Sequence, residues 1–81
     1  MPEAHIEVLV EPFKENDPGP HVHAVVDALV RAGLTPDMGP FATTANGDIA
    51  TITAAVDELI TDGFGAGATA IQLRVELHDV E

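Results

Sequence analysis

The sequence contains no cysteine, tryptophan or tyrosine, and phenylalanine supplies only three of its 81 residues. The absence of cysteine excludes a disulfide framework, a thiolate zinc site and a cysteine nucleophile. Serine is also absent, which excludes the Gly-x-Ser-x-Gly nucleophile elbow. Thr43 and Thr44 have no histidine within sequence reach that could act as their base. We therefore expect no catalytic residue and a protein that is not an enzyme.

Basic residues are scarce as well, with three lysines and arginines against fourteen acidic residues and a net charge of −11. Binding to a phosphate backbone needs cations that displace counterions, so we expect no nucleic-acid partner. The same deficit disfavours an anionic membrane surface. A cationic or neutral small ligand would be attracted instead. The composition is equally typical of a protein from a high-salt host, and charge alone does not separate these two explanations.

The first ten residues carry Glu3 and Glu7 and have neither a basic start nor a long apolar run. This segment resembles neither a signal peptide nor a membrane anchor, so we expect the protein to be cytoplasmic. A chain of this length is expected to form one domain, residues 1–81. Because so short a chain buries only about two-thirds of its unfolded surface, its core must be compact or shared with another subunit.

Two segments show the alternation of a half-buried β-strand, residues 5–11 near the N-terminus and residues 70–78 near the C-terminus. Their inward-facing residues are predicted to be Ile6, Val8, Val10, Ile71, Leu73, Val75 and Leu77. Residues 16–20 form a run of turn residues that cannot continue a sheet, so the chain is expected to break there.

Two further segments have the periodicity of amphipathic helices. Residues 20–32 place valines and a leucine three and four positions apart, and Gly33 suits the position just after the helix. Asp48 is predicted to cap a second helix whose buried stripe is Ile49, Ile52, Val56, Leu59 and Ile60. Several glycines could end this helix, and we predict its end near Gly67.

Two shorter segments complete the fold. Residues 34–40 are limited by their prolines to an edge or irregular strand, and residues 43–46 predict a short strand closed by Asn46 and Gly47. The order β-α-β-β-α-β predicts an α+β, ferredoxin-like fold in which two helices cover one face of a four-stranded antiparallel sheet. The opposite face would show Glu7, Leu9, Glu11, Arg74 and Glu76. This composition suits a wet interface or a ligand surface better than a dry core.

The histidines give no strong metal signal. His21 and His23 would point about 200° apart on a helix, so we predict two solvated histidines rather than a metal site. His5 and His78 lie on the outward sides of strands predicted to be neighbours, where cross-strand pairing is possible, although two solvated histidines are the favoured interpretation. The adjacent carboxylates at positions 57 and 58 diverge on a helix, which indicates a solvated face rather than an acid and base pair.

Residues 38–48 are the most informative stretch, because they combine glycine, proline, hydroxyls, an amide and an aromatic ring in one connection. Polar groups on a rigid turn can orient a small heterocycle, and Phe41 offers a face for stacking or cation–π contact. The alternative is a plain hairpin whose threonines merely suit β geometry. From the residues alone the two interpretations are about equal.

Three short motifs resemble those of a known family. They are Ala32-Gly33-Leu34, the run Gly39-Pro40-Phe41-Ala42-Thr43-Thr44-Ala45-Asn46-Gly47-Asp48, and Ala66-Gly67-Ala68 before the last strand. Over residues 5 to 78 the chain resembles the small thiamine-binding protein family. The YkoF-like domains of that family carry a helix closing in Ala-Gly-Leu, a Gly-Pro-Phe/Met-Gly-Thr-x-x-Glu-Gly turn and an Ala-Gly-Ala sequence before the final strand.

The resemblance implies a ferredoxin-like domain that forms a homodimer or homotetramer and binds thiamine, or its hydroxymethylpyrimidine part, without chemistry and without a further cofactor. By position, Phe41, Thr43 and Gly47 match the family turn, whereas Ala42 replaces a glycine and Asn46 a glutamate. Asn46 can still both donate and accept hydrogen bonds. The predicted ligand-binding residues are Phe41, Thr43, Thr44 and Asn46. The alternative function is an oligomeric interaction module that has no small ligand of its own.

Overall fold

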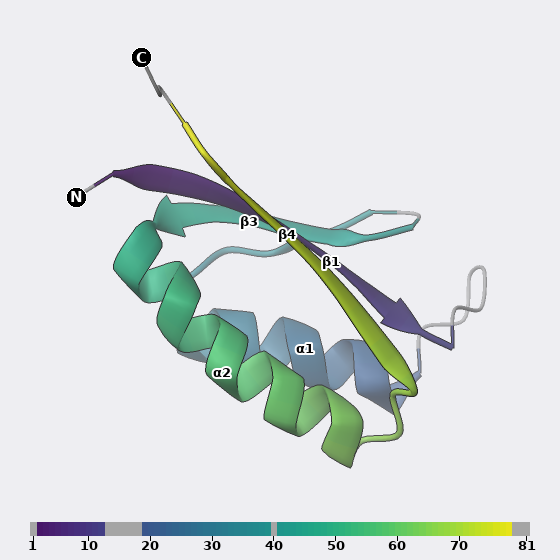
Figure 1. Cartoon of the computed structure of the whole chain (residues 1–81). Helices are drawn as coiled ribbons and strands as arrows, with labels where there is room; N and C mark the ends of the chain where they lie inside the picture. The colour runs from purple at the N-terminus through teal and green to yellow at the C-terminus, as the bar shows by residue number, and fades with distance from the viewer. Residues whose placement is uncertain (1, 13–18, 40, 79–81) are drawn as a thin grey trace.

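The computed structural model describes residues 2–12, 19–39 and 41–78. In chain order its elements are β1 (Glu3–Glu11), α1 (Pro20–Arg31), β2 (Asp37–Met38), β3 (Thr43–Asp48), α2 (Ile49–Gly65) and β4 (Ala70–Leu77). The strands form one antiparallel sheet in the order β2-β3-β1-β4, and both helices lie on the same face of it (Figure 1). This arrangement confirms the predicted ferredoxin-like fold. Most of the break predicted at residues 16–20 lies outside the described residues.

The central strand β1 is longer than the sequence predicts, because it begins at Glu3 and pairs along its length with β4 and β3. Glu3 and Ala4 are the partners of Asp48 and Gly47. The prediction that Asn46 and Gly47 close the third strand is therefore wrong, since β3 continues to Asp48. The expected irregular segment at residues 34–40 contributes only the two residues of β2, and Pro40 lies outside the described residues.

The core lies between the helix-facing side of β1 and the two helices. Its largest fully buried side chains are Ile6 and Val8 of β1, Val25 and Leu29 of α1, and Ile52 and Leu59 of α2. Burial of each such side chain stabilises the fold by about 1.5–3 kcal/mol. The first strand and the stripe of α1 therefore pack as their periodicity predicts. In α2 the prediction holds for Ile52 and Leu59 but is wrong for Ile60, which is 37% exposed.

The helix ends are set by local hydrogen bonds and glycine geometry. Asp48 caps α2, because its carboxylate accepts from the backbone N–H of Thr51 at 3.0 Å, which confirms the predicted N-cap. The helix ends at Gly65, two residues before the predicted end, and Gly67 with φ +113° lies in the following turn. Gly33, with φ +97°, follows α1 as expected. No helix in the described ranges is long and apolar enough to cross a bilayer.

Strand β4 differs from the prediction in its burial. Leu73, Val75 and Leu77 lie on the helix-facing side, yet they are 37%, 43% and 46% exposed. The prediction that they are inward and buried is therefore wrong for this strand. Among the described elements no strand lies beyond β4, and α2 packs chiefly against α1, so these side chains are only partly covered. The alternation predicted correctly which face of the sheet these side chains lie on, but not how much of them the helices cover.

Candidate functional site

The face of the sheet opposite the helices carries polar side chains that the strand register arranges in rows. Glu7 of β1 has Thr44 of β3 as its partner on one side and Arg74 of β4 on the other. Thr44 is in turn the partner of Asp37 in β2. Because cross-strand partners lie side by side on one face, Thr44, Glu7 and Arg74 form one polar row across the sheet.

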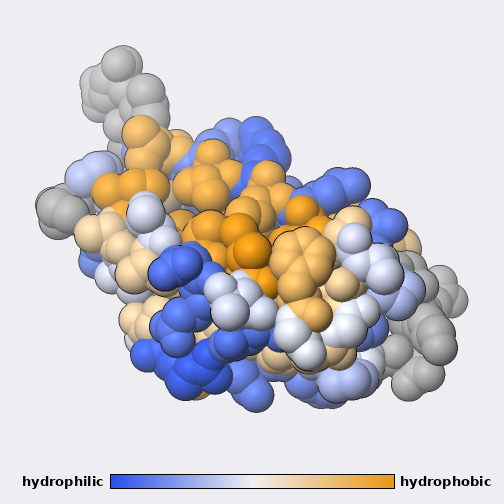
Figure 2. Space-filling view, turned by 60° about the horizontal axis from the view of Figure 1, so that its bottom comes forward, coloured by the Kyte–Doolittle hydropathy of each residue, from blue (hydrophilic) through white to orange (hydrophobic). Residues whose placement is uncertain are grey.

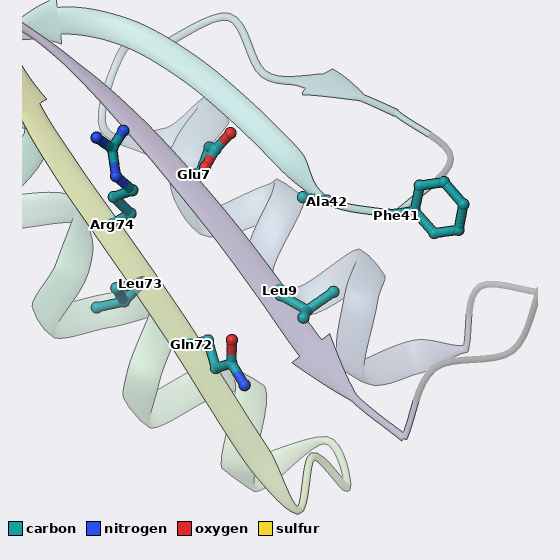
Figure 3. Close-up of a pocket in the computed structure, with 7 residues that line it drawn as sticks. All are labelled: Glu7, Leu9, Phe41, Ala42, Gln72, Leu73 and Arg74. Atoms are coloured by element: carbon teal, nitrogen blue, oxygen red, sulfur yellow. The ribbon is translucent and has the colours of Figure 1, made fainter.

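A depression of about 280 Å³ lies beside this row (Figure 3). It is lined by Glu7, Leu9, Phe41, Ala42, Gln72, Leu73 and Arg74. Figure 3 shows β1 and β4 carrying one side of the depression, with Phe41 on the chain just before β3. The backbone N–H of Gly39 donates to the carbonyl of Ala42 at 2.9 Å, which closes the turn that presents the phenyl ring. The depression therefore combines charged, amide and apolar groups.

Arg74 is held on the open face by a bidentate pair with Glu76. Its two terminal nitrogens donate to the two carboxylate oxygens of Glu76 at 3.1 and 3.2 Å. This hydrogen bonding, followed by direct charge attraction, lowers the pKa of Glu76 and raises the pKa of Arg74. The Glu7 carboxylate adds a smaller attraction that also raises the pKa of Arg74. Both groups of the pair are therefore charged at neutral pH.

A second cluster lies nearer the other end of the open face. Nδ1 of His5 donates to Oδ1 of Asn46 at 3.0 Å, and Nε2 of His78 donates to the same oxygen at 2.9 Å. The two imidazole rings meet edge to face with centroids 6.1 Å apart. Since the oxygen accepts both bonds, Asn46 is left with its amide N–H groups to offer to a ligand. The cross-strand pairing of the two histidines that the sequence allowed is thus mediated by Asn46.

The structure separates the four predicted ligand-binding residues. Phe41 borders the depression and is 65% exposed, and Thr44 and Asn46 lie on the open face as partners of Glu7 and His5. Thr43 is the partner of the buried Val8 and is only 3% exposed, so it lies on the helix-facing side. The structure therefore brings three of the four to the open face and places Thr43 in the core.

The remaining lining residues were not among the predicted site residues. Glu7 and Arg74 were assigned to the open face by strand alternation, but nothing local marked them or Gln72 as part of a depression. The signal that could have found them is the register, because it makes Glu7 and Arg74 direct partners and places Gln72 opposite Leu9. That register depends on contacts between segments far apart in sequence.

The histidines at the start of α1 have separate environments. Nε2 of His21 donates to the carbonyl of Pro12 at 2.7 Å, and the residue is only 9% exposed. The prediction of a solvated His21 is therefore wrong, because the side chain is buried and links the start of α1 to Pro12, the residue that follows β1. His23 is exposed as expected. Within the described residues no group of three or more histidine, cysteine, aspartate or glutamate side chains is arranged to hold a metal ion.

Comparison with known proteins places the chain among small proteins of the same fold. No protein-family model and no curated protein matches the sequence. A protein of Thermotoga maritima, provisionally described as a thiamine biosynthesis/salvage protein, is 25% identical with a TM-score of 0.60, over 93% of this chain and 83% of that chain.

Two other solved structures share the fold at lower identity. A hypothetical protein of Methanocaldococcus jannascii is 15% identical with a TM-score of 0.72, over all of this chain and 84% of its own. DUF77, a domain of unknown function from Bacillus cereus, is 19% identical with a TM-score of 0.58, over 98% of this chain and 77% of its own. The chain is thus similar to small ferredoxin-like proteins, one of which carries a thiamine-related description.

Proposed function

We propose that the protein binds thiamine, or its hydroxymethylpyrimidine moiety, on the open face of the sheet, without catalysing a reaction and without a further cofactor. The observation that carries this proposal is the depression on the open face, whose lining includes Glu7, Gln72 and Phe41. Binding of this kind would serve thiamine salvage, transport or sensing.

The chemistry of the ligand matches these groups. An aminopyrimidine has an exocyclic amine that donates hydrogen bonds and ring nitrogens that accept them. The carboxylate of Glu7 is an acceptor, and the amide of Gln72 can both donate and accept. The ring of Phe41 offers a stacking face for the heterocycle or a cation–π contact for the thiazolium, and the net charge of −11 attracts the cation.

Thr44 and Asn46 extend the proposed site along the open face. The hydroxyl of Thr44 belongs to a residue paired with Glu7, so it lies beside the carboxylate that would hold the amine. Asn46 retains donors after its oxygen accepts from the two histidines. Thr43 has no place in this site because its side chain lies on the helix-facing side.

The comparisons support the same class of ligand. The chain resembles small thiamine-binding proteins in its sequence motifs, and the Thermotoga maritima protein with a thiamine-related description matches 93% of the chain. We further propose that the protein works in the cytoplasm as a homodimer or homotetramer, with neither nucleic acid nor a membrane as partner. The alternative, an oligomeric module with no small ligand, is favoured by one observation, the exposed apolar side of β4.

Isothermal titration with thiamine and with hydroxymethylpyrimidine, at low and at high salt, tests the binding proposal. We expect saturable binding of both ligands, and binding that persists at high salt, because the depression rather than the overall charge supplies most of the contacts. Phe41→Ala should weaken binding, whereas Phe64→Ala, which removes an exposed ring from α2, should not. If neither ligand produces heat at millimolar concentration, the proposal is wrong.

A further inference from the structure

Strand β4 is a long edge strand that lacks the shortness, the proline and the lysine by which other edge strands avoid pairing. It has eight residues, no proline and no lysine, and β1 is its single neighbour in the described sheet. The opposite edge, β2, has only two residues and follows Pro36 directly. Natural proteins shorten or charge edge strands that must remain unpaired, as β2 illustrates. The length and composition of β4 indicate a strand that pairs with something.

The backbone groups on the outer side of β4 belong to its apolar residues. The N–H of His78 donates to the carbonyl of Glu3 at 2.9 Å, which fixes the alternation of the ladder with β1. Every second residue back from His78 therefore bonds to β1, and the residues between them direct N–H and C=O outward. These intervening residues include Leu73, Val75 and Leu77. The same three residues therefore offer a partner both free backbone hydrogen-bonding groups and apolar side chains.

The exposed side chains of β4 continue into an apolar area on α2. Ile60 and Phe64 are 37% and 48% exposed, and α2 packs against β4 where Gly63 approaches Ile71. Figure 2 shows apolar side chains gathered in one continuous area on the side of the molecule that carries the helices. A partner that pairs with β4 would cover its apolar row and lie beside this area of α2.

We propose that β4 pairs antiparallel with β4 of a second copy of this chain, about a two-fold axis at Val75. An axis at a residue keeps apolar side chains opposite apolar ones, because direct partners then lie an even number of residues apart. With the axis at Val75, Leu73 faces Leu77 of the second copy on the helix side. On the open face Arg74 faces Glu76 of the second copy, and the symmetry forms this ion pair twice.

Other registers lack this complementarity. An axis at Arg74 would place two guanidinium groups opposite each other, and an axis at Glu76 would oppose two carboxylates, which is unfavourable. An axis at Leu73 would leave both charged residues without an opposite charge as direct partner. The match of β4 with itself, rather than its apolar character alone, identifies a second copy as the occupant.

The mass of the protein in solution tests whether this surface associates. Light scattering coupled to size exclusion should give twice the chain mass of 8.5 kDa, and Val75→Arg should return it to the mass of one chain, since two like charges would meet at the axis. Val30→Arg, which adds the same charge at an exposed apolar position of α1, should leave the dimer intact. A monomeric wild type, or a dimeric Val75→Arg, overturns the proposal.

Charge reversal tests the register. Arg74→Glu and Glu76→Arg should each be monomeric alone, because each places like charges opposite each other twice. An equimolar mixture of the two variants should recover the dimer as a heterodimer. In both variants positions 74 and 76 of one chain carry like charges, so the ion pair within the chain cannot form in the mixture. Recovery of the dimer therefore reports the ion pairs between the two copies. A mixture that remains monomeric overturns the Val75 axis.

Cross-linking provides a test that disturbs the fold least. The chain has no cysteine of its own, and Val75→Cys would place two thiols as direct partners at a separation that a disulfide can span. Oxidation should link this variant quantitatively, whereas Val30→Cys should remain unlinked. Failure of Val75→Cys to link overturns the proposal. Ligand titration of Val75→Arg separates this result from the binding proposal, because all the lining residues of the depression belong to one chain.

Discussion

Glu7 of β1 and Arg74 of β4 are direct cross-strand partners on the open face of the sheet, yet the guanidinium of Arg74 donates its hydrogen bonds to Glu76. In the described part of the chain, the Glu7 carboxylate is therefore left with acceptor capacity at the edge of the depression. Arg74 lies next to this carboxylate and attracts it electrostatically, but its hydrogen bonds go to Glu76. An exposed acceptor beside a fixed cation is suited to a ligand that brings its own donor groups.

This arrangement predicts that Glu7→Gln weakens thiamine binding. Loss of a charge-assisted hydrogen bond to the ligand amine should reduce affinity roughly tenfold or more. Titration calorimetry measures the change directly. The matched control is Glu3→Gln, because it makes the same change in charge on the same strand and the same face, two rows away. If both variants lose affinity equally, the effect comes from net charge and not from the depression.

The adjacent threonines are predicted to have different effects when shortened. Thr43→Ala removes a buried side chain that is 3% exposed and should destabilise the fold by about 1 kcal/mol. Thr44→Ala, on the open face, should leave stability within about 0.5 kcal/mol and weaken ligand binding. Urea unfolding and ligand titration of both variants separate the two effects. Weaker binding in a stable Thr43→Ala variant would contradict the assignment of this residue to the core.

The same pair of residues shows how far the sequence predicts the site. The stretch around Phe41 drew attention because it gathers polar and aromatic residues, and Phe41 does border the depression. The predicted site included both Thr43 and Thr44, although consecutive residues of a strand point to opposite faces. Local composition therefore located the region, and strand alternation within β3 decides which of its side chains reach the open face.

The sequence predicted the elements of the fold better than it predicted the end of β3 and the exposure of β4. Alternation and helical periodicity depend on neighbouring residues, so they identified the core face of β1 and most of the buried stripes of the helices, with Ile60 of α2 the exception. The continuation of β3 through Gly47 depends on pairing with Ala4, which no local pattern encodes. The exposure of Val75 depends on how much of β4 the helices cover, and alternation reports only the face on which a residue lies.

The cap of α2 predicts a specific response to acid. Hydrogen bonds from the backbone and hydroxyl of Thr51 lower the pKa of Asp48 below its ordinary value of 3.8. Because the folded value lies below the unfolded one, the stabilisation is fully present above the unfolded pKa and is lost as the pH falls through the folded pKa. Wild-type stability should therefore fall between about pH 5 and pH 2 more steeply than that of Asp48→Asn, which keeps a capping oxygen but does not titrate. Urea unfolding of both proteins across this pH range measures the difference. If their stabilities fall in parallel with pH, the charge of Asp48 does not stabilise the helix.

The close approach of α2 to β4 predicts opposite outcomes for two glycines of one helix. A Cβ at Gly63 would come within 2.9 Å of the Ile71 side chain and 3.2 Å of Val25, whereas a Cβ at Gly65 would meet nothing within 4 Å. Gly63→Ala should therefore destabilise the fold by about 1–3 kcal/mol through overpacking. Gly65→Ala should be neutral or add up to about 1 kcal/mol, because alanine favours the helical conformation. Denaturant unfolding of both variants measures the difference. If Gly63→Ala is as stable as Gly65→Ala, the helix can move away from the strand, and the packing that holds α2 beside the exposed row of β4 is looser than the structure indicates.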